Sequence, residues 1–214
     1  YLPAEALDQM EPFYPLHARV CEQCLLVQLP PVQTPQSFFN DQYAYFSSFS
    51  DSWLAHARDY AAAMIRRFEL GPSHRVVEVA SNDGYLLQYF QAAGIPVLGI
   101  DPARNCAEAA AAKGIPTEIR FFGAETARAL APAYSADLMA ANNVLAHVPD
   151  INDFVEGFRI LLQPEGVATF EFPHLLNLIQ HNEFDTIYHE HYSYLSLYTT
   201  QQIFAAHELT VFDV

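Results

Sequence analysis

A chain of 214 residues, 51% of them apolar, is long enough to bury one substantial core and a smaller appended module, and it is too apolar to be a disordered protein. Its formal net charge of -15 repels a phosphate backbone, and no basic cluster offsets that charge, so we expect no nucleic-acid partner. No apolar run approaches the about eighteen residues of a membrane span, and the first residues lack the basic region of a signal peptide. We therefore expect no membrane partner and a cytoplasmic location.

Residues 1–35 hold six of the fourteen prolines, which favours loops and short strands over helices. Within them, Cys21 and Cys24 flank two residues and precede an apolar stretch, as in one half of a zinc knuckle. A structural zinc ion takes four ligands, and this segment offers one thiolate pair, with His17 as a weak third candidate. The alternative is two unliganded cysteines, because an isolated pair at this spacing is a weak signal.

Residues 38–52 are rich in aromatic and hydroxyl side chains and poor in charge, which is unusual for a solvated linker. Four of these side chains would suit the wall of a pocket for a polar ligand: Tyr43, Tyr45, Ser47 and Ser48. A loop that packs its rings onto the core is an equally good interpretation of the same pattern.

From residue 53 onward, the spacing of apolar residues predicts alternating helices and strands. A helix over residues 53–70 ends at Gly71 and Pro72 and should cover a sheet. We expect strands near residues 76–80, 96–101, 116–121, 136–142, 166–172 and 209–214. Further helices are expected near residues 84–93, 103–113, 123–131, 151–162 and 199–207. This alternation predicts an α/β fold, a Rossmann-like parallel sheet with helices on both faces.

The stretch 76–87 has the order of a ligand-binding strand, turn and helix. Asp101 ends the next apolar strand, seventeen residues beyond Gly84, where a carboxylate can accept both hydroxyls of a ribose. The turn has one glycine in place of the GxGxxG that lets a backbone approach a pyrophosphate, which favours a nucleoside such as S-adenosylmethionine. The candidate cofactor-binding residues are Glu78, Ala80, Ser81, Asn82, Asp83, Gly84, Asp101, Pro102, Asn142 and His147. For His147, a structural role is at least as compatible with the sequence as a chemical one.

A cluster of proton-transfer groups lies at residues 188–192, YHEHY. A histidine can take a proton near neutral pH, an adjacent carboxylate can stabilise an imidazolium, and a phenol can donate to an oxyanion. Such groups suit a reaction in which a proton is removed from a substrate and the resulting negative charge is stabilised. The alternatives are a metal site that uses His189 and His191, or packing.

The motifs together resemble a known family. VEVASNDG, Asp101 and NNVLAHVPD are similar to motifs of class I S-adenosylmethionine-dependent methyltransferases. In addition, CEQCLLVQL, YAYFSS, EFPHLL and YHEHYSYLSL follow one another as in the sugar C-methyltransferases of deoxysugar biosynthesis, a resemblance over nearly the whole chain.

The resemblance implies a partial zinc-binding module and substrate loop in residues 1–50 and a methyltransferase domain in residues 51–214. It implies S-adenosylmethionine and zinc as cofactors, with Cys21 and Cys24 as ligands, and a nucleotide-linked keto-deoxysugar as the substrate. It also implies that His191 is the base, with Tyr188 and Glu190 beside the sugar. We include Tyr43 and Tyr45 in the candidate catalytic set.

The sequence departs from the family pattern at both ends, since a first cysteine pair is missing and Val214 falls inside an expected strand. We therefore expect a fragment of a longer protein, inactive by itself and less stable than its parent. An O- or N-methyltransferase for a small metabolite would share the cofactor half of the pattern. A nucleotide-binding module without catalysis, or an NAD-dependent enzyme, is the alternative from another class.

Overall fold

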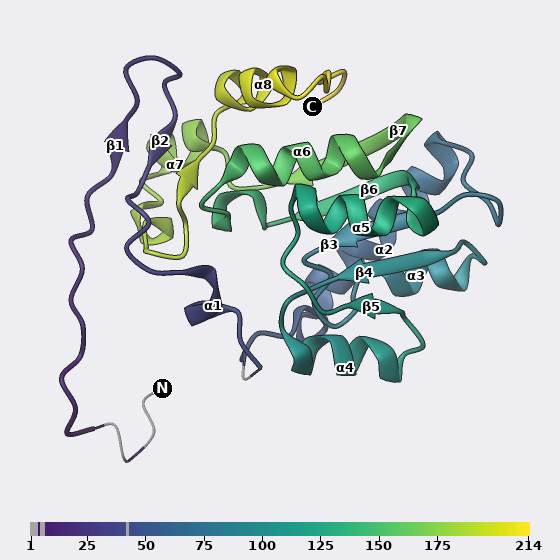
Figure 1. Ribbon diagram of the computed structural model, residues 1–214, viewed down its shortest axis with the longest axis horizontal. Coiled ribbons are helices and arrows are strands. Elements are labelled where there is room, and N and C mark those ends of the chain that lie inside the picture. The colour runs from purple at the N-terminus through teal and green to yellow at the C-terminus, as the bar shows by residue number, and fades with distance from the viewer. Residues whose placement is uncertain (1–3, 5–6, 42) are drawn as a thin grey trace.

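The computed structural model describes residues 4, 7–41 and 43–214 (Figure 1). Its main sheet has the order β5-β4-β3-β6-β7, and every neighbouring pair of strands is parallel. The strands are β3 (Val76–Val79), β4 (Val97–Ile100), β5 (Thr117–Glu118), β6 (Ala136–Asn142) and β7 (Leu162–Glu171). The predicted Rossmann-like α/β fold is thus confirmed.

Helices pack on both faces of this sheet because the strand residues alternate between two cores. Val77 and Val79 face the core formed with α5 (Ala124–Tyr134), α6 (Ile151–Leu161) and α8 (Leu197–Ala206). Val76 faces the other core, formed with α2 (Asp51–Arg67), α3 (Leu87–Ala92) and α4 (Arg104–Ala112). The helix predicted over residues 53–70 therefore covers the sheet as expected.

The strand order reverses at β3, which lies between β4 and β6. In open α/β sheets, ligands bind at the carboxyl ends of the strands beside such a reversal. The fold therefore directs attention to the turn that follows β3.

A second, three-stranded sheet joins the beginning of the chain to its last third. The antiparallel hairpin of β1 (Arg19–Val20) and β2 (Val27–Gln28) pairs with β8 (Ser193–Tyr194). Figure 1 shows this hairpin beside α7 (Leu175–His181), and Leu29 packs with Leu178 there. Short helical turns complete the fold: α1 (Pro35–Phe38), η2 (Ser47–Phe49), η3 (Leu145–His147) and η4 (Phe184–Thr186).

The prediction of a strand at residues 209–214 is wrong, because this segment forms neither a helix nor a strand. Leu209 and Val211 pack against the core of the α5–α6 face, so burial of alternate side chains explains the strand-like pattern. The segment is also held at Asp213, whose carboxylate pairs with Arg67 at 2.5 Å. In the described part of the chain, no helix is both long and apolar enough to cross a membrane.

Candidate active site

The turn after β3 is built on left-handed backbone conformations. Ala80, Asn82 and Gly84 have φ angles of 58°, 49° and 75°, so alternate residues of the turn lie in a region that favours glycine or asparagine. Hydrogen bonds hold the turn closed, from the Ala80 amide to the Ile100 carbonyl at 2.8 Å and from the Gly84 amide to the Ser81 carbonyl at 3.0 Å. The strand–turn–helix predicted here is confirmed.

Asp101 follows β4 and faces this turn. Its Oδ2 accepts the Asn82 amide and its Oδ1 accepts the Ala103 amide, both at 2.8 Å. Each carboxylate oxygen retains a free lone pair after these bonds, so the group can still accept hydroxyls. Burial raises the pKa of Asp101, opposed by the two amide bonds. The chain therefore holds an oriented acceptor at the mouth of the sheet.

A cavity of about 440 Å³ opens at this edge of the sheet. It is lined by eight of the predicted site residues: Tyr43, Tyr45, Ala80, Asn82, Asp101, Pro102, Asn142 and His147. Its wall also contains Phe121 and Phe122, which our sequence reasoning missed. Both follow β5, and the strand-end rule that identified Asp101 could have found them as well.

Three other predicted cofactor residues shape the turn from behind the cavity. Ser81 is fully buried, and Asp83 is only 2% exposed. Gly84 has a positive φ, and a Cβ there would lie 2.4 Å from Ile115 Cδ1. These residues hold the turn in place.

Glu78 lies in the middle of β3 and is fully buried. Burial raises its pKa well above the ordinary range, while the nearby Tyr85 hydroxyl opposes this shift. The carboxyl group therefore keeps its proton to a higher pH than an ordinary glutamate does. Glu78 does not line the cavity itself, but Tyr85 does, so Glu78 influences the cavity through Tyr85.

The cluster at residues 188–191 lies beside the cavity and meets it through His147. The ring centroids of His147 and His191 are 4.6 Å apart, and the rings meet edge to face. Burial lowers the pKa of His147 to about 4 and also lowers that of His191, so both rings are neutral near pH 7. Neutral rings are compatible with this close approach, whereas two cations would repel each other.

The hydrogen bonds of His191 define its tautomer. Nδ1 lies 2.7 Å from the Thr186 carbonyl, which can only accept, so Nδ1 carries the proton. Nε2 of the neutral ring then has a lone pair, and it accepts the Tyr188 hydroxyl at 3.0 Å. The arrangement orients a basic nitrogen and couples it to a phenol that is 40% exposed.

Tyr43 connects the two parts of the site. Burial raises its pKa, and so do the negative charges of Glu190 and Asp101. The ring centroids of Tyr43 and Phe39 are 5.3 Å apart, and those of Phe39 and His147 are 5.8 Å apart. The phenol of Tyr43 therefore stays protonated between the strand-end carboxylate and the histidine cluster.

The two cysteines of the hairpin lie in the turn between β1 and β2. The Cys21 amide donates to the Leu26 carbonyl at 3.0 Å, and the Leu25 amide donates to the Cys21 carbonyl at 2.9 Å. Backbone amides of Cys24 and Gln23 lower the pKa of Cys21. Among the described residues, no group of three or more His, Cys, Asp and Glu side chains could hold a metal, so neither His17 nor the pair of His189 and His191 completes a site.

Two family models match the chain. A model described as "Methyltransferase domain" matches residues 53–214, and one described as "Putative zinc binding domain" matches residues 1–39. The chain belongs to the methyltransferase-domain family. Its parallel sheet with helices on both faces is therefore the fold of an S-adenosylmethionine-dependent methyltransferase domain.

The comparison with curated proteins finds the C-methyltransferase NovU of Streptomyces niveus. It is 38% identical over 205 residues, which are 95% of this chain and 49% of NovU. The chain thus spans about half the length of this relative.

Solved structures show the same fold at low sequence identity. An S-adenosylmethionine-dependent methyltransferase from Archaeoglobus fulgidus is 16% identical, with a TM-score of 0.57 over 70% of this chain and 67% of that one. Magnesium protoporphyrin IX methyltransferase (ChlM) from Synechocystis PCC 6803, solved with bound S-adenosylmethionine, is 14% identical, with a TM-score of 0.53 over 72% and 67% of the two chains.

Proposed function

We propose that this protein is an S-adenosylmethionine-dependent C-methyltransferase that acts on a nucleotide-linked keto-deoxysugar. The observation that carries the proposal is the orientation of His191 next to the cavity. Its basic Nε2 accepts a hydrogen bond from the Tyr188 hydroxyl. A base of this kind is needed to remove a proton next to a ketone, and O- or N-methylation requires a weaker base or none. The 38% identity to a C-methyltransferase supports the same reaction class.

The residues of the cavity fit the cofactor. Asp101 offers free lone pairs to the ribose hydroxyls, and the aromatic rings of Phe121 and Phe122 offer an apolar wall for the adenine ring. When bound, S-adenosylmethionine supplies an electrophilic methyl group. The turn at residues 80–84 and Asp101 would bind and orient this cofactor, with Asn142 and His147 near its other end.

The proton step belongs to the histidine cluster. In this proposal the Tyr188 hydroxyl turns away from Nε2 of His191 when the sugar binds, which frees the nitrogen lone pair. The α C–H bond of the sugar then breaks, the proton moves to Nε2 of His191, and the electron pair forms an enolate. The Thr186 carbonyl fixes the tautomer that makes this possible. Tyr188 and Glu190 position the sugar and His191, and Tyr43 and Tyr45 line the approach. The protonated phenol of Tyr43 is suited to donate a hydrogen bond to the enolate oxygen.

A zinc ion is the second proposed cofactor. Cys21 and Cys24 are separated by two residues on one tight turn, which fits half of a four-ligand structural site. The family model that matches residues 1–39 supports this assignment. The ion would brace the hairpin whose β2 strand pairs with β8, next to the histidine cluster.

The test is to identify the product of the full-length protein. It should be incubated with S-adenosylmethionine and a panel of nucleotide-linked keto-deoxysugars, and the products analysed by mass spectrometry and NMR. We expect one substrate to gain a methyl group on a carbon atom adjacent to the ketone. A methyl group on oxygen or nitrogen would support the small-molecule alternative and contradict our proposal. Binding of NAD in place of S-adenosylhomocysteine would contradict the cofactor assignment.

A further inference from the structure

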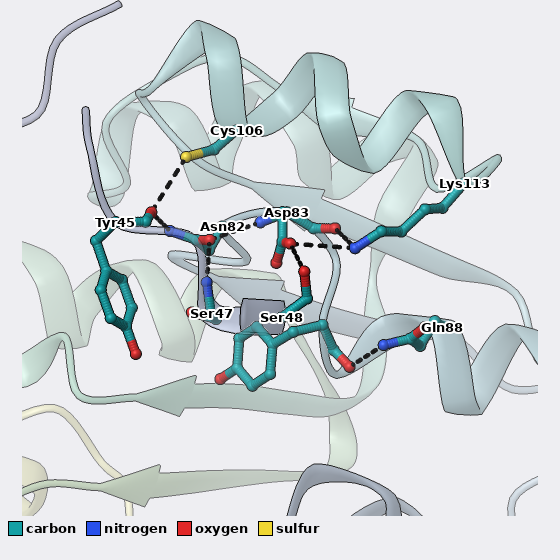
Figure 2. Close-up of polar contacts among 9 residues, drawn as sticks. Tyr45, Ser47, Ser48, Asn82, Asp83, Gln88, Cys106 and Lys113 are labelled. Carbon is teal, nitrogen blue, oxygen red and sulfur yellow. Dashed lines mark hydrogen bonds and ion pairs between the residues drawn. The ribbon is translucent and has the colours of Figure 1, made fainter. Parts of the chain in front are cut away.

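The side chain of Asn82 joins two segments (Figure 2). One is the turn at residues 80–84, which we call the cofactor turn, and the other is the loop at residues 43–48, which we call the substrate-side loop. Its Nδ2 donates to the Tyr45 carbonyl at 3.0 Å, and its Oδ1 accepts the Ser47 amide at 2.9 Å. The backbone amide of the same residue donates to Asp101. One asparagine, 7% exposed, thus contacts both the strand-end carboxylate and a loop 35 residues earlier in the chain.

The neighbouring residue strengthens the same connection. Asp83 accepts the Ser48 hydroxyl, and its carboxylate pairs with Lys113 at 3.1 Å. Lys113 also donates to the Asp83 carbonyl at 2.8 Å, so one lysine holds both the side chain and the backbone of Asp83. Figure 2 shows these contacts gathered between the turn and the substrate-side loop.

The loop is fastened through its backbone, which leaves its aromatic rings available to the cavity. The anchored atoms are the Tyr45 carbonyl, the Ser47 amide and the Tyr43 carbonyl, which accepts Asn105 Nδ2 at 2.7 Å. Tyr43 and Tyr45 both line the cavity, and Tyr45 is 55% exposed. The position of the turn therefore determines where the two rings lie.

We propose that Asn82 is a positioning residue through which cofactor binding at Asp101 orders the substrate-side loop for the second substrate. A ligand that engages the Asp101 carboxylate lies one hydrogen bond from the Asn82 backbone, and the Asn82 side chain continues to Tyr45 and Ser47. Because such coupling is reciprocal, an ordered loop also favours the bound cofactor. This inference rests on the proposed function for its kinetic consequence, while its structural consequence can be measured without a sugar.

The substitution Asn82→Gly separates the two roles of this residue. Glycine adopts the left-handed φ of 49° without strain and keeps the amide that bonds Asp101, but it lacks the side chain that reaches the loop. The matched control is Asn182→Gly, because Asn182 is also left-handed, with φ 56°, but caps α7. A second variant, Asn82→Asp, keeps an acceptor for the Ser47 amide and loses the donor to Tyr45.

The experiment measures backbone hydrogen exchange of residues 43–48 in the full-length protein, with and without S-adenosylhomocysteine. We expect the ligand to slow exchange in the wild type and in Asn182→Gly, to slow it less in Asn82→Asp, and to have no effect in Asn82→Gly. Affinity for S-adenosylhomocysteine should fall in Asn82→Gly by the coupling factor but should not be lost, since the contribution of the ordered loop disappears while the Asp101 contact remains. Methyl transfer by Asn82→Gly should show a KM for the sugar raised about ten-fold or more, the scale of two or three lost hydrogen bonds.

Three results would overturn the inference: ligand-dependent protection that persists in Asn82→Gly, protection that is absent from the wild type, or loss of S-adenosylhomocysteine binding in Asn82→Gly. Failure of the proposed function gives a different pattern. In that case the wild type binds S-adenosylhomocysteine and protects the loop, but it forms no C-methylated sugar.

Discussion

At the scale of single residues, the site depends on polar groups that are buried and oriented. His191 has its tautomer fixed by the Thr186 carbonyl, and Asp101 has both oxygens aligned by backbone amides. Because both side chains are nearly enclosed, small changes in their partners should have large effects.

The first prediction concerns Asp101, the proposed acceptor of the cofactor's ribose hydroxyls. Asp101→Ala should weaken binding of S-adenosylhomocysteine by about ten-fold or more, because the ribose hydroxyls lose a buried acceptor. Isothermal calorimetry measures this affinity, and Asp59→Ala on the exposed surface of α2 is the control. Equal affinities in Asp101→Ala and the wild type would remove Asp101 from the cofactor site.

The second prediction concerns Glu78, the carboxyl group buried in β3. A pKa raised by folding means that this group contributes most to stability below its unfolded pKa and that this contribution falls as pH rises toward the folded value. Glu78→Gln should therefore be more stabilised relative to the wild type at pH 8 than at pH 5. Thermal unfolding at both pH values checks the sign, and a relative stability of the variant that does not change with pH would show that Glu78 is charged in the fold.

At the scale of elements, most of the main sheet could be predicted from periodicity. The strands around β3, β4 and β6 and the helices between them follow from continuous apolar runs with glycine and proline at their ends. The segment 209–214 could not be predicted, because alternating burial appears equally in a strand and in an extended segment packed on a core. The pairing of β2 with β8 was also beyond reach, since two-residue strands have no periodicity.

The candidate site likewise contains residues that could be predicted from the sequence and contacts that could not. Strand-end residues such as Asp101 and Asn142 could be located because the fold places them at one edge. The contacts of Asn82 with the loop could not, because they depend on how a loop 35 residues away folds back. The contact of Lys113 with Asp83 could not either, because it depends on how the end of α4 packs against the turn.

The third prediction belongs to the β1–β2 hairpin. Full-length protein should contain about one zinc ion per chain under the four-ligand rule, and Cys21→Ser should lose it. Cys106→Ser is the matched control, because Cys106 is buried in α4, away from the hairpin. Elemental analysis of the purified proteins makes the comparison, and a well-folded wild type without zinc would refute the assignment.

At the scale of the whole molecule, the candidate site combines three parts of the chain. The main sheet supplies the cofactor turn, the loop at residues 43–48 supplies Tyr43 and Tyr45, and the segment before β8 supplies His191. The small sheet β1-β2-β8 connects the hairpin to the histidine cluster, so the N-terminal region is structurally part of the site's support. This assembly explains why motifs far apart in the sequence act together in our proposal.

The central claim is that His191 removes the α-proton, and exchange of the sugar's α-hydrogen with deuterated water tests it most directly. The full-length protein is incubated with the keto-sugar and S-adenosylhomocysteine, and deuterium uptake is followed by NMR. We predict exchange in the wild type and in the exposed control His181→Ala, and a rate lowered about 10²–10⁴-fold in His191→Ala, the usual loss for a general base. S-adenosylhomocysteine should still bind His191→Ala. Exchange retained in His191→Ala but lost in Tyr188→Phe would contradict the claim and assign the base to Tyr188.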